Sequence, residues 1–334
     1  MAEPAAPAAP AELEAEAPAA PARKPRRLDF VGRRNWYFAL SLLIILPGLI
    51  SMVSQGFLLG IDFAGGTEFF LKFQESPSLA QVNAAVASTG VSATVQQGAN
   101  SSYIIRTGFA DPQHQRSFEA ELQAKLGPED QSFRSVQTVG GTIAGETVRN
   151  AFIAVLTASA LILGYLAFRF RRVQGGWRSG FQFGGSALLA LLHDVAVLTG
   201  VFSILGKGIG FLGFHGSLLG QIDSLFMTAV LTVVGFSVHD TIVVFDRIRE
   251  NMIVSRSLTF EQIVNLSIMQ TAARSIITSF TVVLVLLALL IAGGDSLKGF
   301  VLALLVGIVS GTYSSIFNAS PLLVVWRRMA GATR

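Results

Sequence analysis

The chain has 334 residues, of which 51% are hydrophobic and only 14% are charged, whereas about 25% of residues are charged in a typical soluble protein. The mean hydropathy is +0.56. A water-soluble monomer of this composition lacks the charge to cover its surface, so the composition indicates a membrane protein. The absence of cysteine excludes disulfides, Cys-based zinc sites and thiol catalysis. The net charge of +4 is too small to indicate a nucleic-acid partner.

The first segment differs from the rest of the chain. Residues 1–22 consist almost entirely of Ala, Pro and Glu, and the first basic residue is Arg23. Such a segment cannot bury a core, so we expect residues 1–27 to form a disordered cytoplasmic tail. Because the start is acidic, no signal peptide is predicted.

Six stretches are apolar and long enough to cross the ~30 Å hydrocarbon core of a bilayer. They are approximately Trp36–Met52, Thr147–Phe168, Phe183–Leu205, Ser224–Phe245, Ser275–Ala292 and Leu297–Val325. We therefore expect transmembrane helix 1 within residues 28–54, helices 2–6 within residues 147–326, and a cytoplasmic tail at residues 327–334.

Basic residues orient these spans. They precede the first span, follow the sixth, and lie between spans 2 and 3 and between spans 4 and 5. They are Arg23, Lys24, Arg26, Arg27, Arg33, Arg34, Arg169, Arg171, Arg172, Arg178, Arg247, Arg249, Arg256, Arg327, Arg328 and Arg334. The short loops on the other side offer only Lys207 and Lys298. The positive-inside rule then places both termini in the cytoplasm. The alternative is that one of the less apolar segments does not cross the membrane. In that case the basic loops would no longer all lie on the same side.

Residues 55–146, between spans 1 and 2, have the pattern of a small soluble domain. The predicted elements are a strand at Thr67–Phe73, a helix from a capping box at Ser78 to about Thr89, strands at Val91–Gln97 and Tyr103–Thr107, a helix from Asp111-Pro112 to Leu126, and a strand at Phe133–Val139. This β-α-β-β-α-β order is typical of a ferredoxin-like unit. The predicted fold is therefore a polytopic α-helical membrane protein with six transmembrane helices and one α+β ferredoxin-like extracytoplasmic domain between helices 1 and 2.

Several ionisable or polar residues interrupt the spans, where charge is costly and usually marks an ion or proton route. They are His193 and Asp194 in the third span, His239, Asp240 and Thr241 in the fourth, and Arg274 at the start of the fifth. The fourth span ends near Phe245, so Asp240 lies ~8 Å from its cytoplasmic end. Since Arg274 enters from that same side, we predict that the two charges lie at similar depth and can meet.

An Asp that alternates between an Arg-paired state and a neutral protonated state is a proton carrier. We therefore predict a proton pathway through the six residues, with protons as the coupling ion and no other cofactor. A first alternative is that Asp240 and Arg274 form a fixed ion pair, or that the His-Asp pairs only tie helices together. A second is that the two His-Asp pairs bind a divalent metal, although adjacent residues point ~100° apart on a helix.

Four segments resemble the SecD/SecF family of protein-export membrane proteins, within the resistance-nodulation-division superfamily. Residues 60–67 (GIDFAGGT) resemble the signature that opens the periplasmic domain, and residues 190–195 the third span. Residues 234–251 resemble the fourth span and its following loop, and residues 274–279 the start of the fifth. The resemblance covers about residues 30–328. Its structural motif residues are Asp62, Gly65, Gly66, Asp246 and Arg247.

The resemblance implies a non-enzymatic accessory subunit of the Sec protein-export machinery in the cell inner membrane. Such a subunit pairs with SecD, contacts membrane lipids, and assists the SecYEG channel and the SecA motor. It uses the proton motive force to promote translocation of preproteins. By the same resemblance Asp240 is the proton-binding carboxylate and Arg274 its charge partner, while Phe236 replaces the usual Tyr and His239 the usual Asn. The alternatives are a small-molecule efflux transporter subunit of the same superfamily and a structural membrane scaffold.

Overall fold

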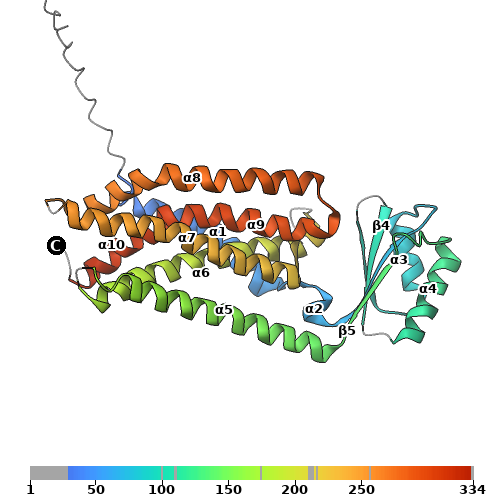
Figure 1. The fold of residues 1–334 in the computed structure, drawn as a ribbon. Helices are drawn as coiled ribbons and strands as arrows, with labels where there is room; N and C mark the ends of the chain where they lie inside the picture. Colours follow the sequence, from blue (N-terminus) through green and yellow to red (C-terminus); the bar gives the residue numbers. More distant parts are fainter. Residues whose placement is uncertain are drawn as a thin grey trace, which may run out of the picture.

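The computed structural model describes residues 29–331, except for residues 99–100, 109–110, 174, 210–213, 216 and 256. The predicted tail, residues 1–27, lies outside the described residues, as do Arg256 and Arg334. A bundle of long helices makes up most of the molecule, and a smaller mixed domain lies at one end of it (Figure 1).

Six helices are long and apolar enough to cross a membrane, which confirms the predicted number of spans. They are α1 (Arg34–Gln55), α5 (Gly141–Arg169), α6 (Trp177–Lys207), α7 (Ser224–Val254), α8 (Phe260–Ala292) and a sixth span built from α9 (Asp295–Ser314), a π-helical turn (Ser315–Ala319) and α10 (Ser320–Met329). Large apolar side chains such as Leu156 on α5 and Val285 on α8 are exposed on the outside of the bundle. A surface of this kind suits lipid contact. The chain is a multi-pass membrane protein.

Helices α7 and α8 are longer than the predicted spans. They have 31 and 33 residues, and at ~1.5 Å per residue both exceed the ~30 Å hydrocarbon core. Their polar ends are held by side chains: Thr259 forms a capping box at the start of α8, and Asn251 Nδ2 donates to Ser267 Oγ at 2.8 Å. The apolar stretches therefore predicted only the central part of each helix.

The domain formed by the residues between α1 and α5 has the predicted ferredoxin-like order. Its elements are β2 (Gly66–Lys72), α3 (Leu79–Ala87), β3 (Ala93–Gln97), β4 (Ser102–Thr107), α4 (Pro112–Leu126) and β5 (Ser135–Val139). The strands form one antiparallel sheet in the order β3-β4-β2-β5. Phe69 on β2 and Leu122 on α4 belong to its separate apolar core.

Both predicted helix starts in this domain are confirmed. Ser78 forms the capping box with Gln81, and Asp111 accepts from the backbone N–H groups of Gln113 and His114, both at 2.9 Å. The last strand begins two residues later than predicted, because Phe133 lies in a turn with 48% of its surface exposed.

Short elements join the domain to the bundle. The segment after α1 forms β1 (Leu58–Leu59) and α2 (Ile61–Ala64) before it enters the sheet. Between α6 and α7 lie β6 (Gly208–Ile209), β7 (Phe214–His215), a short 3₁₀ helix (Leu218–Gly220) and β8 (Gln221–Ile222). Strand β1 pairs in parallel with β8, so the entrance of the domain lies against the start of α7. This pairing joins segments 163 residues apart and was not predicted from the sequence.

Glycines allow the central helices to approach closely. A Cβ atom built on Gly307 of α9 would lie 2.2 Å from Val233 Cγ2 of α7, and one on Gly311 would lie 3.0 Å from Ser237 Cβ. Small residues therefore form a close packing face on the sixth span. It holds α9 against α7 beside the predicted polar residues.

Candidate proton-binding site

Asp194 lies on α6 in the middle of the bundle, and only 1% of its surface is exposed. Three serine hydroxyls donate to it: Ser237 Oγ to Oδ2 at 2.6 Å, Ser314 Oγ to Oδ2 at 2.7 Å and Ser310 Oγ to Oδ1 at 2.8 Å. The carboxylate is therefore satisfied by hydroxyl groups from α7 and α9 rather than by an Arg or Lys side chain.

His193 completes this cluster. Its Nδ1 lies 3.0 Å from Asp194 Oδ1, and its ring centroid lies 6.0 Å from that of Tyr313. Its Nε2 is buried and has no hydrogen-bond partner among the described residues. The predicted association of His193 with Asp194 is therefore a direct contact between neighbours in the sequence.

Asp240 lies on α7 and is 6% exposed. Ser315 Oγ donates to its Oδ2. Thr241 is also buried, and its hydroxyl donates at 3.0 Å to the backbone oxygen of Ser237, the residue that bonds Asp194. Asp194, Asp240, His193 and Thr241 are thus brought into one polar cluster between α6, α7 and the sixth span.

The π-helical turn of the sixth span lies at this cluster. Ser314, directly before the turn, bonds Asp194 on α6, and Ser315, the first residue of the turn, bonds Asp240 on α7. Turns of this type are rare and occur frequently at functional sites. One short segment therefore serves both buried carboxylates.

Arg274 and His239 lie outside the cluster. Arg274 is exposed on α8, one residue before the buried Ser275, and it forms no ion pair with Asp240 in the described part of the chain. His239 is exposed on α7 beside Asp240. Adjacent residues point ~100° apart on a helix, and Arg274 and His239 turn outward while their neighbours Ser275 and Asp240 are buried. The expected meeting of Asp240 and Arg274, and with it the alternative of a fixed ion pair, is absent from this conformation.

Three serines of the sixth span were not predicted as partners of the aspartates: Ser310, Ser314 and Ser315. Their spacing could have indicated a polar contact inside the bundle. Ser310 and Ser314 are four residues apart, so they share a helix face in an otherwise apolar stretch.

The motif residues lie at the two ends of the bundle. Asp62 Oδ2 accepts from Ser224 N at 3.0 Å. Gly65 and Gly66 adopt φ angles of +73° and +121° at the start of the sheet, a conformation that glycine adopts readily.

At the other end, Arg169 Nη2 donates to Asp246 Oδ2 at 3.1 Å, which ties α5 to α7. Arg247 pairs with Glu250 at 2.8 Å and donates to Gln270 Oε1 at 2.6 Å. These five residues therefore hold connections between elements and do not contact the buried aspartates.

The described residues contain no group of three or more His, Asp or Glu side chains that could hold a metal ion. The two His-Asp pairs do not converge, because His239 is exposed while His193 points toward Asp194. The geometry therefore gives no support to the metal alternative.

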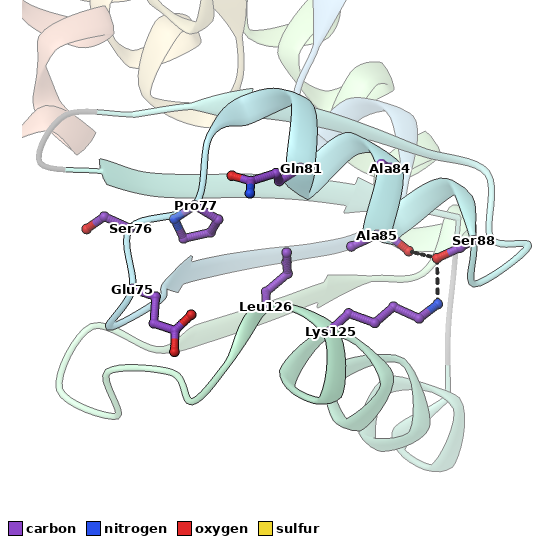
Figure 2. A pocket seen from close by; sticks show the side chains of 9 residues that line it. All are labelled: Glu75, Ser76, Pro77, Gln81, Ala84, Ala85, Ser88, Lys125 and Leu126. Atoms are coloured by element: carbon purple, nitrogen blue, oxygen red, sulfur yellow. Dashed lines mark hydrogen bonds between the residues drawn. The ribbon is translucent and has the colours of Figure 1, made fainter.

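A surface hollow of about 460 Å³ lies in the ferredoxin-like domain (Figure 2). Its lining residues are Glu75, Ser76, Pro77, Gln81, Ala84, Ala85, Ser88, Lys125 and Leu126. Lys125 Nζ donates to Ser88 Oγ. None of the predicted site residues lies in this hollow, so the cluster inside the bundle is the candidate site.

Two family models match the chain. Residues 119–329 match the family described as "Protein export membrane protein SecD/SecF, C-terminal". The chain belongs to the SecD/SecF family. Residues 50–76, which contain Asp62, Gly65 and Gly66, match the SecD/SecF GG motif. The junction between α1 and the sheet is therefore a family feature.

Similar proteins extend over nearly the whole chain. Protein translocase subunit SecF of Thermobaculum terrenum is 45% identical, over 90% of this chain and 94% of its own length. The SecF subunit of Haemophilus influenzae is 35% identical, over 87% of this chain and 83% of its own. The crystal structure of SecDF, a translocon-associated membrane protein from Thermus thermophilus, is 34% identical with a TM-score of 0.75 over 90% of this chain. The match covers only 39% of that SecDF chain.

Proposed function

We propose that the chain is the SecF-type subunit of a protein translocase and promotes the translocation of preproteins together with a SecD-type partner. Support comes from the SecF subunits that match it over nearly their full length. The match covers only 39% of the SecDF chain and leaves a further part of it unmatched. A separate SecD-type subunit supplies that part, and the SecYEG channel, the SecA motor and the preprotein are the further partners.

The observation that carries the proposed mechanism is the pair of buried aspartates bonded by serine hydroxyls. A serine hydroxyl can donate to a carboxylate and can accept from a protonated carboxyl group. The serines around Asp194 and Asp240 therefore serve both protonation states without moving to another partner. A fixed cation would hold such a carboxylate in the charged state, and no Arg or Lys pairs with either aspartate in the described residues. This arrangement suits a group that takes up and releases a proton.

Asp240 is the primary proton-binding residue in this proposal, with Asp194, His193 and Thr241 beside it. Arg274 acts as its charge partner in a second conformation, which requires α8 to rotate so that the guanidinium enters the bundle. A membrane potential of ~100 mV supplies ~2.3 kcal/mol per charge moved, which is enough to bias such a two-state change. His239 is next to Asp240 but exposed, so it joins the pathway only in a conformation that turns α7.

We place the protein in the cell inner membrane with both termini in the cytoplasm and the ferredoxin-like domain outside. The basic residues of the loops support this orientation. Arg171 lies two residues after the end of α5, and its Cζ atom is 4.1 Å from the ring centroid of Phe168 and 5.5 Å from that of Trp177. Aromatic and basic side chains together are typical anchors at the membrane surface.

Precursor export into inverted membrane vesicles tests the proposal. With the SecD-type partner present, wild type should accelerate translocation when a proton gradient is applied, and Asp240→Asn should lose that acceleration while remaining assembled. Asp246→Asn on the same helix is the matched control, because its ion pair with Arg169 lies outside the cluster. Unchanged gradient-dependent export by Asp240→Asn would exclude Asp240 as the carrier. If neutral replacement of Arg274 is tolerated as well, the scaffold alternative gains support.

A further inference from the structure

The extracytoplasmic end of α7 is held by two carboxylates. Asp223 Oδ1 accepts from Phe226 N at 2.8 Å and so caps the helix. Asp62 Oδ2, 162 residues away in the sequence, accepts from Ser224 N at 3.0 Å. The first N–H groups of a helix have no intrahelical partner and carry partial positive charge, so carboxylates bind there favourably. One of these two carboxylates comes from outside the α6–α7 segment.

Asp62 belongs to α2, which leads directly into the extracytoplasmic sheet. Gly60 N donates to Ile222 O at 2.8 Å, so the backbone before Asp62 is fixed to the strand before α7. Strand β2 begins at Gly66, and a Cβ atom built there would lie 2.5 Å from Thr107 O of β4. The short segment between Asp62 and the sheet therefore leaves little slack for independent movement.

A second contact runs in parallel. Arg106 on β4 donates both to Glu68 on β2 and to Gln221 on β8. The side chains of Arg106 and Glu68 are only 12% and 9% exposed. This contact links the two central strands of the sheet to the residues directly before α7, because Gln221 is two residues from Asp223.

We propose that Asp62, Arg106, Gln221 and Asp223, which we call the outer joint, are positioning residues that couple helix α7 to the extracytoplasmic domain. The inference rests on the proposed function, because α7 carries Asp240, ~24 Å from Ser224 along the helix axis at ~1.5 Å per residue. A continuous helix transmits a shift at one end to the other. When proton binding at Asp240 displaces α7, the outer joint makes the domain move with it.

The absence of cysteine makes a distance measurement straightforward. Ala120→Cys on α4 and Ser296→Cys at the extracytoplasmic start of α9 are exposed positions for a pair of fluorescent labels. The labelled full chain is reconstituted in liposomes with its SecD-type partner, and energy transfer is followed after a transmembrane pH step. Wild type should show a change in transfer, and Asp240→Asn should show none. Asp62→Ala should lose the change while proton entry, followed with a dye inside the liposomes, persists.

Asp111→Ala is the matched control. Like Asp62, Asp111 accepts from the first N–H groups of a helix, but that helix is α4 and Asp111 lies outside the outer joint. It should keep the change in transfer, and Asp62→Asn, which keeps an oxygen acceptor, should keep part of it.

A full change in Asp62→Ala, together with none in Asp240→Asn, overturns the outer joint and leaves the proposed function standing. A full change in Asp240→Asn overturns Asp240 as the proton-binding residue of the proposed function, whereas no change in wild type overturns the coupling and leaves the export assay to decide the proposed function. If Asp62→Ala does not reach the membrane, Gln221→Ala removes the Arg106 contact instead. A reduced change is then expected, and an undiminished change refutes the coupling.

Discussion

Removal of one hydroxyl from the buried cluster should measurably weaken the helix bundle. In Ser314→Ala, the Oδ2 atom of Asp194 keeps the bond from Ser237 but loses the 2.7 Å bond from Ser314. Ser314 is fully buried, so water does not readily replace the lost donor. Neutral interhelical hydrogen bonds in membranes contribute ~0.6 kcal/mol on average, and bonds to charged groups contribute ~1.5–3 kcal/mol. We therefore expect a loss of ~1–2 kcal/mol in the free energy of unfolding.

The assay is unfolding of the purified chain in mixed micelles with increasing sodium dodecyl sulfate, followed by tryptophan fluorescence. Thr199→Val is the matched control on α6, because the Thr199 hydroxyl bonds only to carbonyl groups of its own helix, and a change within ~0.5 kcal/mol is expected. In a double-mutant cycle, Ser314→Ala and Asp194→Asn should couple by at least ~0.5 kcal/mol. Equal effects of Ser314→Ala and the control, with no coupling, would refute the assigned hydrogen bond.

Of three further predictions, two concern the ferredoxin-like domain, and one concerns the packing of α6 against α1. Gly66→Ala should destabilise the domain by ~1–3 kcal/mol, since φ is +121° and the new Cβ meets Thr107 O; hydrogen exchange of β2 and β4 should accelerate. Burial raises the pKa of the Glu129 carboxyl group in the folded domain. The unfolded chain therefore loses the carboxyl proton at a lower pH than the folded domain does. Domain stability should therefore fall as pH rises above 4.5, and Glu129→Gln should remove that slope in pH-dependent hydrogen exchange. Gly200→Val should cost ~1–3 kcal/mol in the micelle assay, because a Cβ there would lie 2.8 Å from Gly48 Cα of α1.

The fold was largely predictable because its signals are local. Apolar length alone identifies a membrane span, and all six predicted spans lie within observed helices. The helix starts of the ferredoxin-like domain followed from the caps at Ser78 and Asp111, which are properties of a few consecutive residues. The errors were at helix ends such as Asn251, where polar side chains continue the helix beyond the apolar stretch.

The facing of the intramembrane residues was not predictable in the same way. In a soluble helix the polar face reveals which side points outward, but on α8 the exposed side carries large apolar side chains such as Val285, while the buried side includes Ser275 and Ser279. A shift of one residue therefore separates the exposed Arg274 from the buried Ser275, and the exposed His239 from the buried Asp240. The sequence does predict the depth of these residues but not their rotation about the helix axis.

Contacts between distant segments were also beyond the sequence. Asp62 meets Ser224 across 162 positions, and Ser310 meets Asp194 across 116. The spacing of serines along an apolar span is the same whether they pack against a neighbouring helix or donate to a buried carboxylate. Only the positions of the neighbouring helices separate these roles.

The central claim is that Asp240 takes up and releases a proton inside the bundle. Infrared difference spectroscopy of the reconstituted complex, with carbon-13-labelled aspartate in this chain, tests it most directly. A pH step on wild type should produce the absorption change of a carboxyl group that gains a proton, shifted by the isotope, and Asp240→Asn should lack it while Asp246→Asn retains it. The same isotope-shifted change in Asp240→Asn as in wild type would contradict the claim.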